Sequence, residues 1–172
     1  MTGTALRKAV SQPGDNLTCA RPLDEGTIHT LAALLGAAAA CEVAAWPDRL
    51  LDARIALAVF PAMRLLPVIA VAIWRHPDGS RIRALNYTSS PFSAMTLLPS
   101  GHWLEKEPSP SLVFWARSLD SIDDVSGNHT VSALAIAAAL LRARAHSAAR
   151  EAQFGPPIHL KEEQAHGRYR NA

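Results

Sequence analysis

Residues Tyr87 to Trp103 read YTSSPFSAMTLLPSGHW, and this stretch decides how the middle of the chain folds. The hydroxyl groups of Thr88, Ser89 and Ser90 can accept hydrogen bonds from the unpaired N–H groups at the start of a helix. Pro91 suits a first helical turn, because its missing N–H would have no partner there. The stretch therefore predicts a short helix between two strands.

The same block also predicts which side of this helix is apolar. Phe92, Met95 and Leu98 recur at three-residue spacing and should form one apolar face. Pro99 and Gly101 are residues at which a helix ends and the chain turns. The block contains no set of reactive groups, so it predicts packing and no chemistry.

Length and composition are those of an ordinary globular domain. The chain has 172 residues and a net charge of +2. A chain of this length buries roughly two-thirds of its unfolded surface and needs no disulfide or metal to fold. Cys19 and Cys41 form no CxxC pair, so neither a zinc site nor a disulfide framework is expected. The start of the chain lacks a secretion signal, and we expect a cytoplasmic protein.

One segment, residues 28–45, reads IHTLAALLGAAAACEVAA and is almost entirely apolar or small. Its length is borderline for a membrane span. Most of its residues are alanine, which gains little in lipid, and it contains His29 and Glu42. We expect a packed helix here and no membrane contact.

The chain divides into three regions by composition. Residues 1–23 mix glycine, proline and polar residues without an apolar period, which predicts a loosely held arm. Residues 151–172 are polar and mixed in charge, which predicts a flexible tail. A single domain is expected between them, over residues 24–150.

Two helices are predicted at the start of this domain. The first begins at a cap of Asp24 or Thr27 and runs to about Ala45. The second has Pro47 in its first turn and ends before Pro61. Its apolar residues, at four-residue spacing, are Leu51, Ile55 and Val59.

Strands are predicted in the second half of the domain. Residues 68–75, VIAVAIWR, are rich in β-branched residues and are apolar at both odd and even positions. This pattern predicts one central strand that is covered on both faces. The HPDG turn at 76–79 should connect it to a return strand at 81–87. Residues 102–107 and 111–117 predict a second pair of strands. The fold class is therefore α+β, an α/β sandwich with about four antiparallel strands in two hairpins.

The end of the domain should be a loop followed by a long helix. Residues 120–128 are expected to form the loop, and residues 129–150 the helix. Arg142, Arg144 and Arg150 would lie near its negative end and interact with the helix dipole. Its apolar stripe is formed by Val131, Leu134, Ala138, Leu141 and Ala145.

Three stretches in this order resemble a known family. PDRLLDARIA (47–56), the Tyr87–Trp103 block and HTVSALAIAAALLRARA (129–145) are similar to uncharacterised small phage and prophage proteins of alphaproteobacteria with a phage ABA sandwich domain. The resemblance covers roughly residues 25–148. It departs from the family pattern at Trp46, Leu51 and Ser100. It implies an α/β sandwich and a phage-accessory setting, and it implies no catalytic residues.

A candidate ligand site lies along the first hairpin. Arg75, Arg81 and Arg83 flank it, and Arg81 and Arg83 share a face because strand side chains repeat every two residues. Residues 61–118 contain six basic and three acidic residues. These arginines with Trp103 would suit a small anionic ligand or a nucleotide. The alternative is an ordinary solvated face. No basic recognition helix is present, so duplex DNA is not expected.

Other reactive constellations have weaker support. Asp120, Asp123 and Asp124 could hold a hard cation, but their spacing is not that of an EF-hand. The histidines form no HxH or HExxH arrangement, and no GxSxG elbow or glycine-rich phosphate loop occurs. We therefore assign no metal ligand, cofactor or catalytic residue.

Three functional hypotheses follow. The first is a non-enzymatic phage or prophage accessory protein that acts through protein contacts, with a host or phage protein or with a second copy of itself. The second is a module that binds a small anionic ligand or sequesters a nucleotide. The third is a hydrolase of an unrecognised type that uses the 120–124 loop and a histidine.

Overall fold

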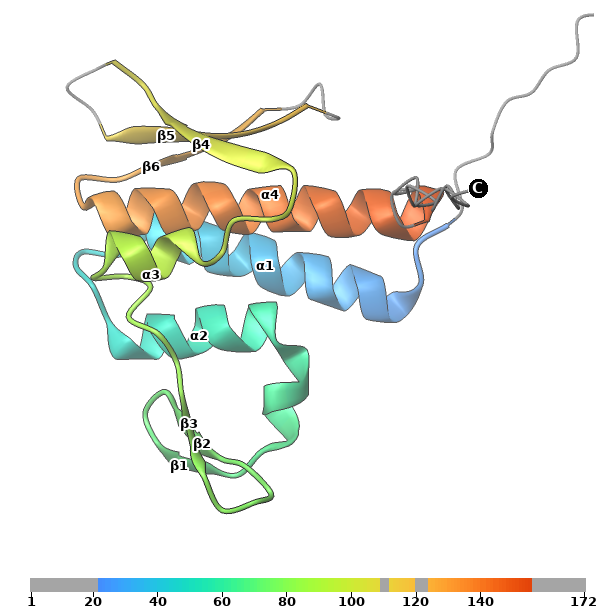
Figure 1. The fold of residues 1–172 in the computed structure, drawn as a ribbon, viewed down its shortest axis with the longest axis vertical. Coiled ribbons are helices and arrows are strands. Elements are labelled where there is room, and N and C mark those ends of the chain that lie inside the picture. Colours follow the sequence, from blue (N-terminus) through green and yellow to red (C-terminus); the bar gives the residue numbers. More distant parts are fainter. Residues whose placement is uncertain (1–21, 109–111, 120–123, 156–172) are drawn as a thin grey trace, which may run out of the picture.

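The structure is a computed structural model, and it describes residues 22–108, 112–119 and 124–155 (Figure 1). Its helices are α1 (Glu25–Val43), α2 (Arg49–Val59), the 3-10 helix η1 (Pro61–Leu65), α3 (Pro91–Met95) and α4 (Ser132–Phe154). Its strands are β1 (Val68–Ala70), β2 (Ile73–Arg75), β3 (Arg81–Arg83), β4 (His102–Lys106), β5 (Val113–Ser118) and β6 (Val125–Asn128). The predicted α+β class is confirmed, but the strands form two three-stranded antiparallel sheets in place of two hairpins.

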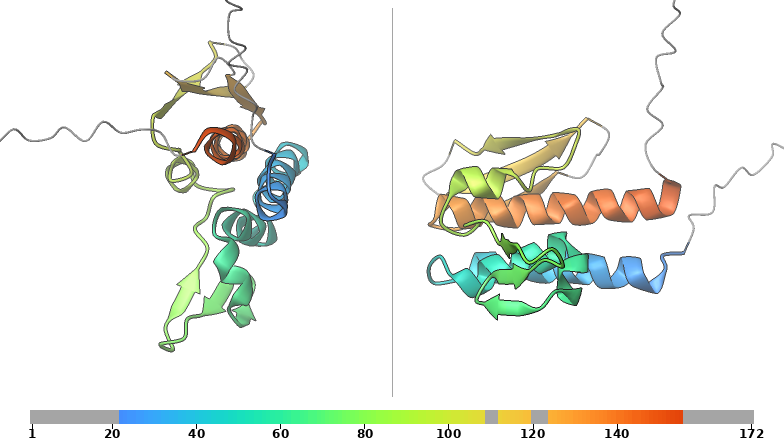
Figure 2. Two further views of the ribbon diagram at one scale, coloured as in Figure 1. Left: turned by 90° about the vertical axis from the view of Figure 1, so that its right-hand side faces the viewer. Right: turned by 60° about the horizontal axis from the view of Figure 1, so that its bottom comes forward.

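Helix α4 is the middle layer of the fold. The β4–β5–β6 sheet covers one side of it, α1 packs along another side, and α3 lies beside it (Figures 1 and 2). Residues 133–141 are all buried. Most of them are alanine, and their small side chains let neighbours approach from every direction. The predicted single apolar stripe is therefore too narrow for this half of the helix, because almost its whole circumference is covered over residues 133–141.

Strand β6 lies very close to α4 at Gly127. A Cβ atom added to Gly127 would collide with the carbonyl oxygen of Ala135 and would lie 2.5 Å from the backbone nitrogen of Ala139. Only glycine fits between the strand and the helix at this point. Strand β6 was not predicted, because its residues Val125–Asn128 include serine, glycine and asparagine, which are poor strand formers.

The two N-terminal helices, α1 and α2, lie where the sequence predicted them. Asp24 caps α1 and accepts a hydrogen bond from the Thr27 N–H at 2.9 Å. Asp48 caps α2 and accepts one from the Leu50 N–H at 3.1 Å. Pro47 therefore lies before the cap and is not in the first turn as predicted. Helix α1 has the length and composition of a membrane span, which core helices can also have. Its buried residues are Leu34, Ala37, Ala38 and Cys41.

The predicted central strand at 68–75 is wrong. The chain turns back after Ala70, and Ala72 takes a positive φ of 58°. Strands β1 and β2 are then antiparallel neighbours in a small sheet with β3 that projects beyond α2 (Figures 1 and 2). Val68 is 69% exposed and Val71 is 53% exposed. Among the described residues, no second layer covers this part of the sheet, so the apolar run does not mark a buried strand.

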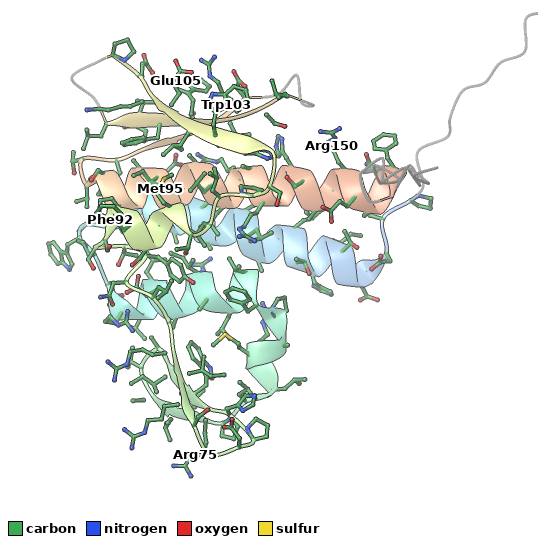
Figure 3. The ribbon with its side chains drawn as sticks, viewed as in Figure 1. Arg75, Phe92, Met95, Trp103, Glu105 and Arg150 are labelled. Carbon is green, nitrogen blue, oxygen red and sulfur yellow. The ribbon has the colours of Figure 1, made fainter. Side chains whose placement is uncertain are left out.

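Helix α3 begins as predicted but packs through different residues. The Ser90 hydroxyl accepts a hydrogen bond from the Ser93 N–H at 3.3 Å, and Pro91 is the first helical residue. Ala94 and Leu97 are buried, and α3 packs on α4. Phe92, by contrast, is 88% exposed (Figure 3). Met95 is exposed as well, and of the predicted apolar face only Leu98 packs against the core.

Candidate functional site

The β2–β3 hairpin holds the arginines that the sequence singled out. Its turn is the predicted one: the His76 N–H donates to the Ser80 carbonyl at 2.9 Å, and Gly79 adopts a φ of 88°. Asp78 accepts a hydrogen bond from the Ser80 N–H at 2.8 Å and lies 2.9 Å from His76 Nδ1. These hydrogen bonds lower the pKa of Asp78 to about 2, and those with Ser80 have the largest effect. This carboxylate is therefore engaged within its own turn.

The register of the hairpin brings the three arginines onto one face. Arg75 lies directly opposite Arg81, and Ile73 lies opposite Arg83. Directly opposed residues point to the same face, as do residues two apart in one strand. The other face carries Trp74, which is buried in the core. The sequence prediction for Arg81 and Arg83 is thus confirmed, and Arg75 joins them.

This face has a positive charge that no described acidic residue matches. Residues 60–86 contain four arginines and one acidic residue, Asp78. Arg75, Arg81 and Arg83 are exposed, and none forms an ion pair with another described residue. Like charges directly opposite one another in a sheet are destabilising. An anionic group bound between Arg75 and Arg81 would relieve that repulsion.

The outer edge of β3 also offers backbone groups. The His76 N–H bonds to Ser80, and the Ala84 N–H bonds to Ala72. Hydrogen-bonded and non-bonded pairs alternate along an antiparallel ladder. The pairs at Arg81 and Arg83 are therefore non-bonded, and the N–H and C=O groups of these two residues point outward. Among the described strands, β3 pairs with β2 alone.

Trp103 does not belong to this surface. It lies on β4 in the other sheet, directly opposite Arg117. Figure 3 shows Arg75 and Trp103 at opposite ends of the molecule. The predicted combination of Trp103 with the three arginines is therefore wrong, because the tryptophan and the hairpin are held on opposite sides of the helical layers.

Arg142 of α4 has structural partners that the sequence did not suggest. Arg142 forms two hydrogen bonds with the Glu42 carboxylate, both 2.6 Å, and donates to the Ser126 carbonyl. It therefore joins α1, α4 and β6. Because α4 continues to Phe154, none of Arg142, Arg144 and Arg150 is in its last turn, and their predicted role in the helix dipole is wrong.

A groove runs along the C-terminal half of α4. Its volume is about 630 Å³, and it is bounded by α1, the end of α2, the connection from α3 to β4, the adjacent ends of β4 and β5, and α4. Leu34, Val59 and Leu98 contribute apolar surface, while Arg144 and Ser147 contribute polar groups. The sequence did not indicate this groove, since its residues come from elements far apart in the chain.

The remaining predicted chemistry finds little support. Asp120 and Asp123 lie outside the described residues, and Asp124 is 3.5 Å from Arg117 in an exposed ion pair. Within residues 22–108, 112–119 and 124–155, no group of three or more histidine, cysteine, aspartate or glutamate side chains could hold a metal. Burial, with a smaller contribution from Asp52, raises the pKa of the Cys41 thiol to about 12. Cys19 lies outside the described residues.

No protein-family model matches the chain, and searches of curated proteins and of solved structures found no match either. The resemblance to phage proteins therefore stays a prediction from the sequence.

Proposed function

We propose that the protein is a binding protein that holds an acidic, extended segment of a partner protein at the outer edge of β3. The observation that supports this best is the coincidence of two features on one short strand. The backbone groups of Arg81 and Arg83 point outward, and their side chains belong to a basic face that has no acidic partner among the described residues.

A protein segment fits this edge better than a lipid or a nucleic acid does. An extended peptide can add to an open sheet edge, and its main chain then supplies donors and acceptors in the spacing that the edge presents. Lipids and nucleic acids do not present N–H and C=O groups at this regular spacing. Main-chain pairing would supply affinity, and the arginines would select the charge of the partner.

The geometry defines the sequence pattern of the segment. On an added strand, the residues opposite Arg81 and Arg83 would be two positions apart and would point to the arginine face. Directly opposed Cβ atoms in a sheet lie roughly 4.5–5.5 Å apart, which is within reach of a charged pair. Carboxylates at positions i and i+2 would then pair with the two arginines.

The biological setting is proposed from the sequence resemblance. In that setting the protein is a phage or prophage accessory protein that acts without catalysing a reaction, and its partner is a host or phage protein. The edge itself requires only that the partner expose an acidic strand or an unfolded acidic stretch.

The test uses two labelled peptides and the full chain. One peptide alternates glutamate with threonine, and the other alternates lysine with threonine. Fluorescence anisotropy should show saturable binding of the glutamate peptide that weakens as salt increases, because exposed charges are screened. The lysine peptide should not bind.

Variants make the test specific to β3. The double variant Arg81→Glu, Arg83→Glu should lose the glutamate peptide and gain the lysine peptide. Arg54→Glu, which changes an exposed arginine on α2, should bind like the unchanged protein. If the double variant still binds the glutamate peptide, or if single-stranded oligonucleotides or anionic vesicles bind in its place, the proposal is overturned.

Proline separates the backbone contribution from the charge. The Arg83 N–H points outward, so proline at this position removes a donor without breaking the bonds to β2. Arg83→Gln removes the charge alone. Arg83→Pro should therefore bind more weakly than Arg83→Gln if the peptide pairs with the main chain, and equal affinities would rule out strand addition.

A small anion is the second candidate occupant, favoured by the direct opposition of Arg75 and Arg81. A phosphate between them would offset their repulsion without any backbone pairing. Native mass spectrometry with a nucleotide panel distinguishes this case. A nucleotide that binds the unchanged protein and is lost in the variant Arg81→Ala, Arg83→Ala would support it, and no bound nucleotide would exclude it.

A further inference from the structure

The groove beside α4 contains a cation whose charge has no described counter-ion. Arg144 Nε donates to the Leu97 carbonyl at 2.6 Å, and Nη2 lies 3.4 Å from the Thr96 carbonyl. Both acceptors are neutral carbonyls at the C-terminal end of α3. Arg144 is partly buried, and this burial lowers the pKa of its guanidinium.

The two carbonyl contacts leave other N–H donors of Arg144 available to a ligand. A guanidinium has five N–H donors and remains charged in proteins, and the two carbonyl contacts engage only Nε and Nη2. No hydrogen bond of Nη1 to a described residue accompanies them. A carboxylate or phosphate could therefore bind to donors that are already oriented by the protein.

The rest of the groove is suited to an apolar group. Among the apolar residues that line the groove, Leu34 and Ala58 are buried, and Val59 and Leu98 beside them are partly buried. A volume of about 630 Å³ is within the roughly 300–1,000 Å³ that is typical of small-molecule sites. The other charged or titratable groups in the lining are His102, Arg150 and Glu151.

We infer that this groove binds a small organic anion with an apolar body, whose acidic group pairs with Arg144 and whose body lies against Leu34, Val59 and Leu98. Arg150 is on the same helix, is exposed, and adds a second positive charge at the rim (Figure 3). Glu151 weakens binding, because its negative charge repels the acidic group of the ligand. The site is separate from the β3 edge, so neither proposal depends on the other.

Octanoate, octylamine and 1-octanol are suitable probes, because they share an apolar chain and differ in charge. Isothermal titration calorimetry with the full chain should show saturable binding of octanoate and no binding of octylamine. If octylamine or octanol binds as well as octanoate, the groove recognises only the apolar chain, and the inference is overturned.

Arg144→Gln should weaken octanoate binding by about 10- to 100-fold, which is the usual effect of losing a charged hydrogen bond. Because Arg144 also bonds to the end of α3, a second variant keeps that contact. Ala148→Leu fills the groove and should reduce binding, whereas Ala149→Leu, at the next position and outside the lining, should not.

Glu151→Gln provides a change in the opposite direction. It removes the like charge and should strengthen binding of octanoate. Binding that is unchanged in Ala148→Leu places the ligand elsewhere, and binding that weakens in Glu151→Gln contradicts the assigned orientation. Failure to observe any saturable binding of octanoate overturns the inference and leaves the β3 proposal unaffected.

Discussion

The Asp52 carboxylate accepts a hydrogen bond from the backbone N–H of Thr88 at 2.8 Å, although the two residues are 36 positions apart in the chain. Arg49 lies 2.7 Å from the same carboxylate and also donates to the Asn86 side chain at 2.6 Å. The start of α2 and the segment before α3 are therefore held together by one polar network.

Removing the Asp52 carboxylate should destabilise the protein. Asp52 is 1% exposed, and Asp52→Ala would leave the Thr88 N–H and part of the Arg49 charge unpaired. We expect a loss of about 2–3 kcal/mol in the free energy of unfolding, measured by urea titration. Asp124→Ala removes an exposed ion pair and should change it little. Equal effects of the two variants would contradict a structural role for the network.

A methyl group at Gly127 should separate β6 from α4. The added atom would meet the backbone at Ala135 and Ala139, which cannot move without shifting the helix. Gly127→Ala should therefore lower the free energy of unfolding by about 2–3 kcal/mol. Gly36→Ala is the matched control, since its nearest neighbour is the movable Arg54 side chain at 3.1 Å. This control should be neutral or stabilising, because alanine favours a helix.

Cys41 should not react with thiol reagents while the protein is folded. Its side chain is fully buried, and burial raises its pKa to about 12, so little thiolate forms at neutral pH. In a Cys19→Ser background, labelling by a chromogenic disulfide should require urea. Ala39→Cys places a thiol on the exposed side of the same helix and should label at once. Rapid labelling of Cys41 in the folded protein would show that α1 separates from the core.

The Glu42–Arg142 pair should make stability depend on pH in the acidic range. Hydrogen bonds from Arg142 lower the pKa of Glu42 from its usual 4.5. The unfolded chain therefore takes up the proton first as the pH falls. The stabilisation is complete above the unfolded pKa and is lost as the pH falls through the folded pKa.

Arg142→Met should remove most of that pH dependence and reduce stability at neutral pH by about 1–2 kcal/mol. Arg150→Met, on the same helix and without an ion pair to a described residue, should leave the pH profile unchanged. The measurement is the urea midpoint between neutral pH and the acid limit of folding. Parallel profiles for wild type and Arg142→Met would refute the assignment.

Features that depend on local chemistry could be predicted from the sequence. Asp24 and Ser90 cap the helices that follow them, and the HPDG turn forms as its residues require. The shared face of Arg81 and Arg83 follows from the two-residue period of a strand. Each of these depends on residues within a few positions of one another.

Features that depend on packing could not be predicted in this way. The spacing of Phe92 and Met95 fits an apolar face, yet Ala94 and Leu97 point toward α4. Ala72 reverses the chain without a glycine or proline to signal it. The separation of Trp103 from the hairpin cannot be predicted from any single segment, and neither can the groove. Both depend on how several elements pack together.

The position of α4 in the chain has a consequence for biosynthesis. This helix follows every other described element, and the faces that α1, α3 and the β4–β6 sheet bury are buried against it. Until the ribosome has released that segment, the earlier elements have no common surface on which to assemble. Nascent chains arrested before it should therefore remain sensitive to protease and bind chaperones, however much of the preceding polypeptide has already emerged.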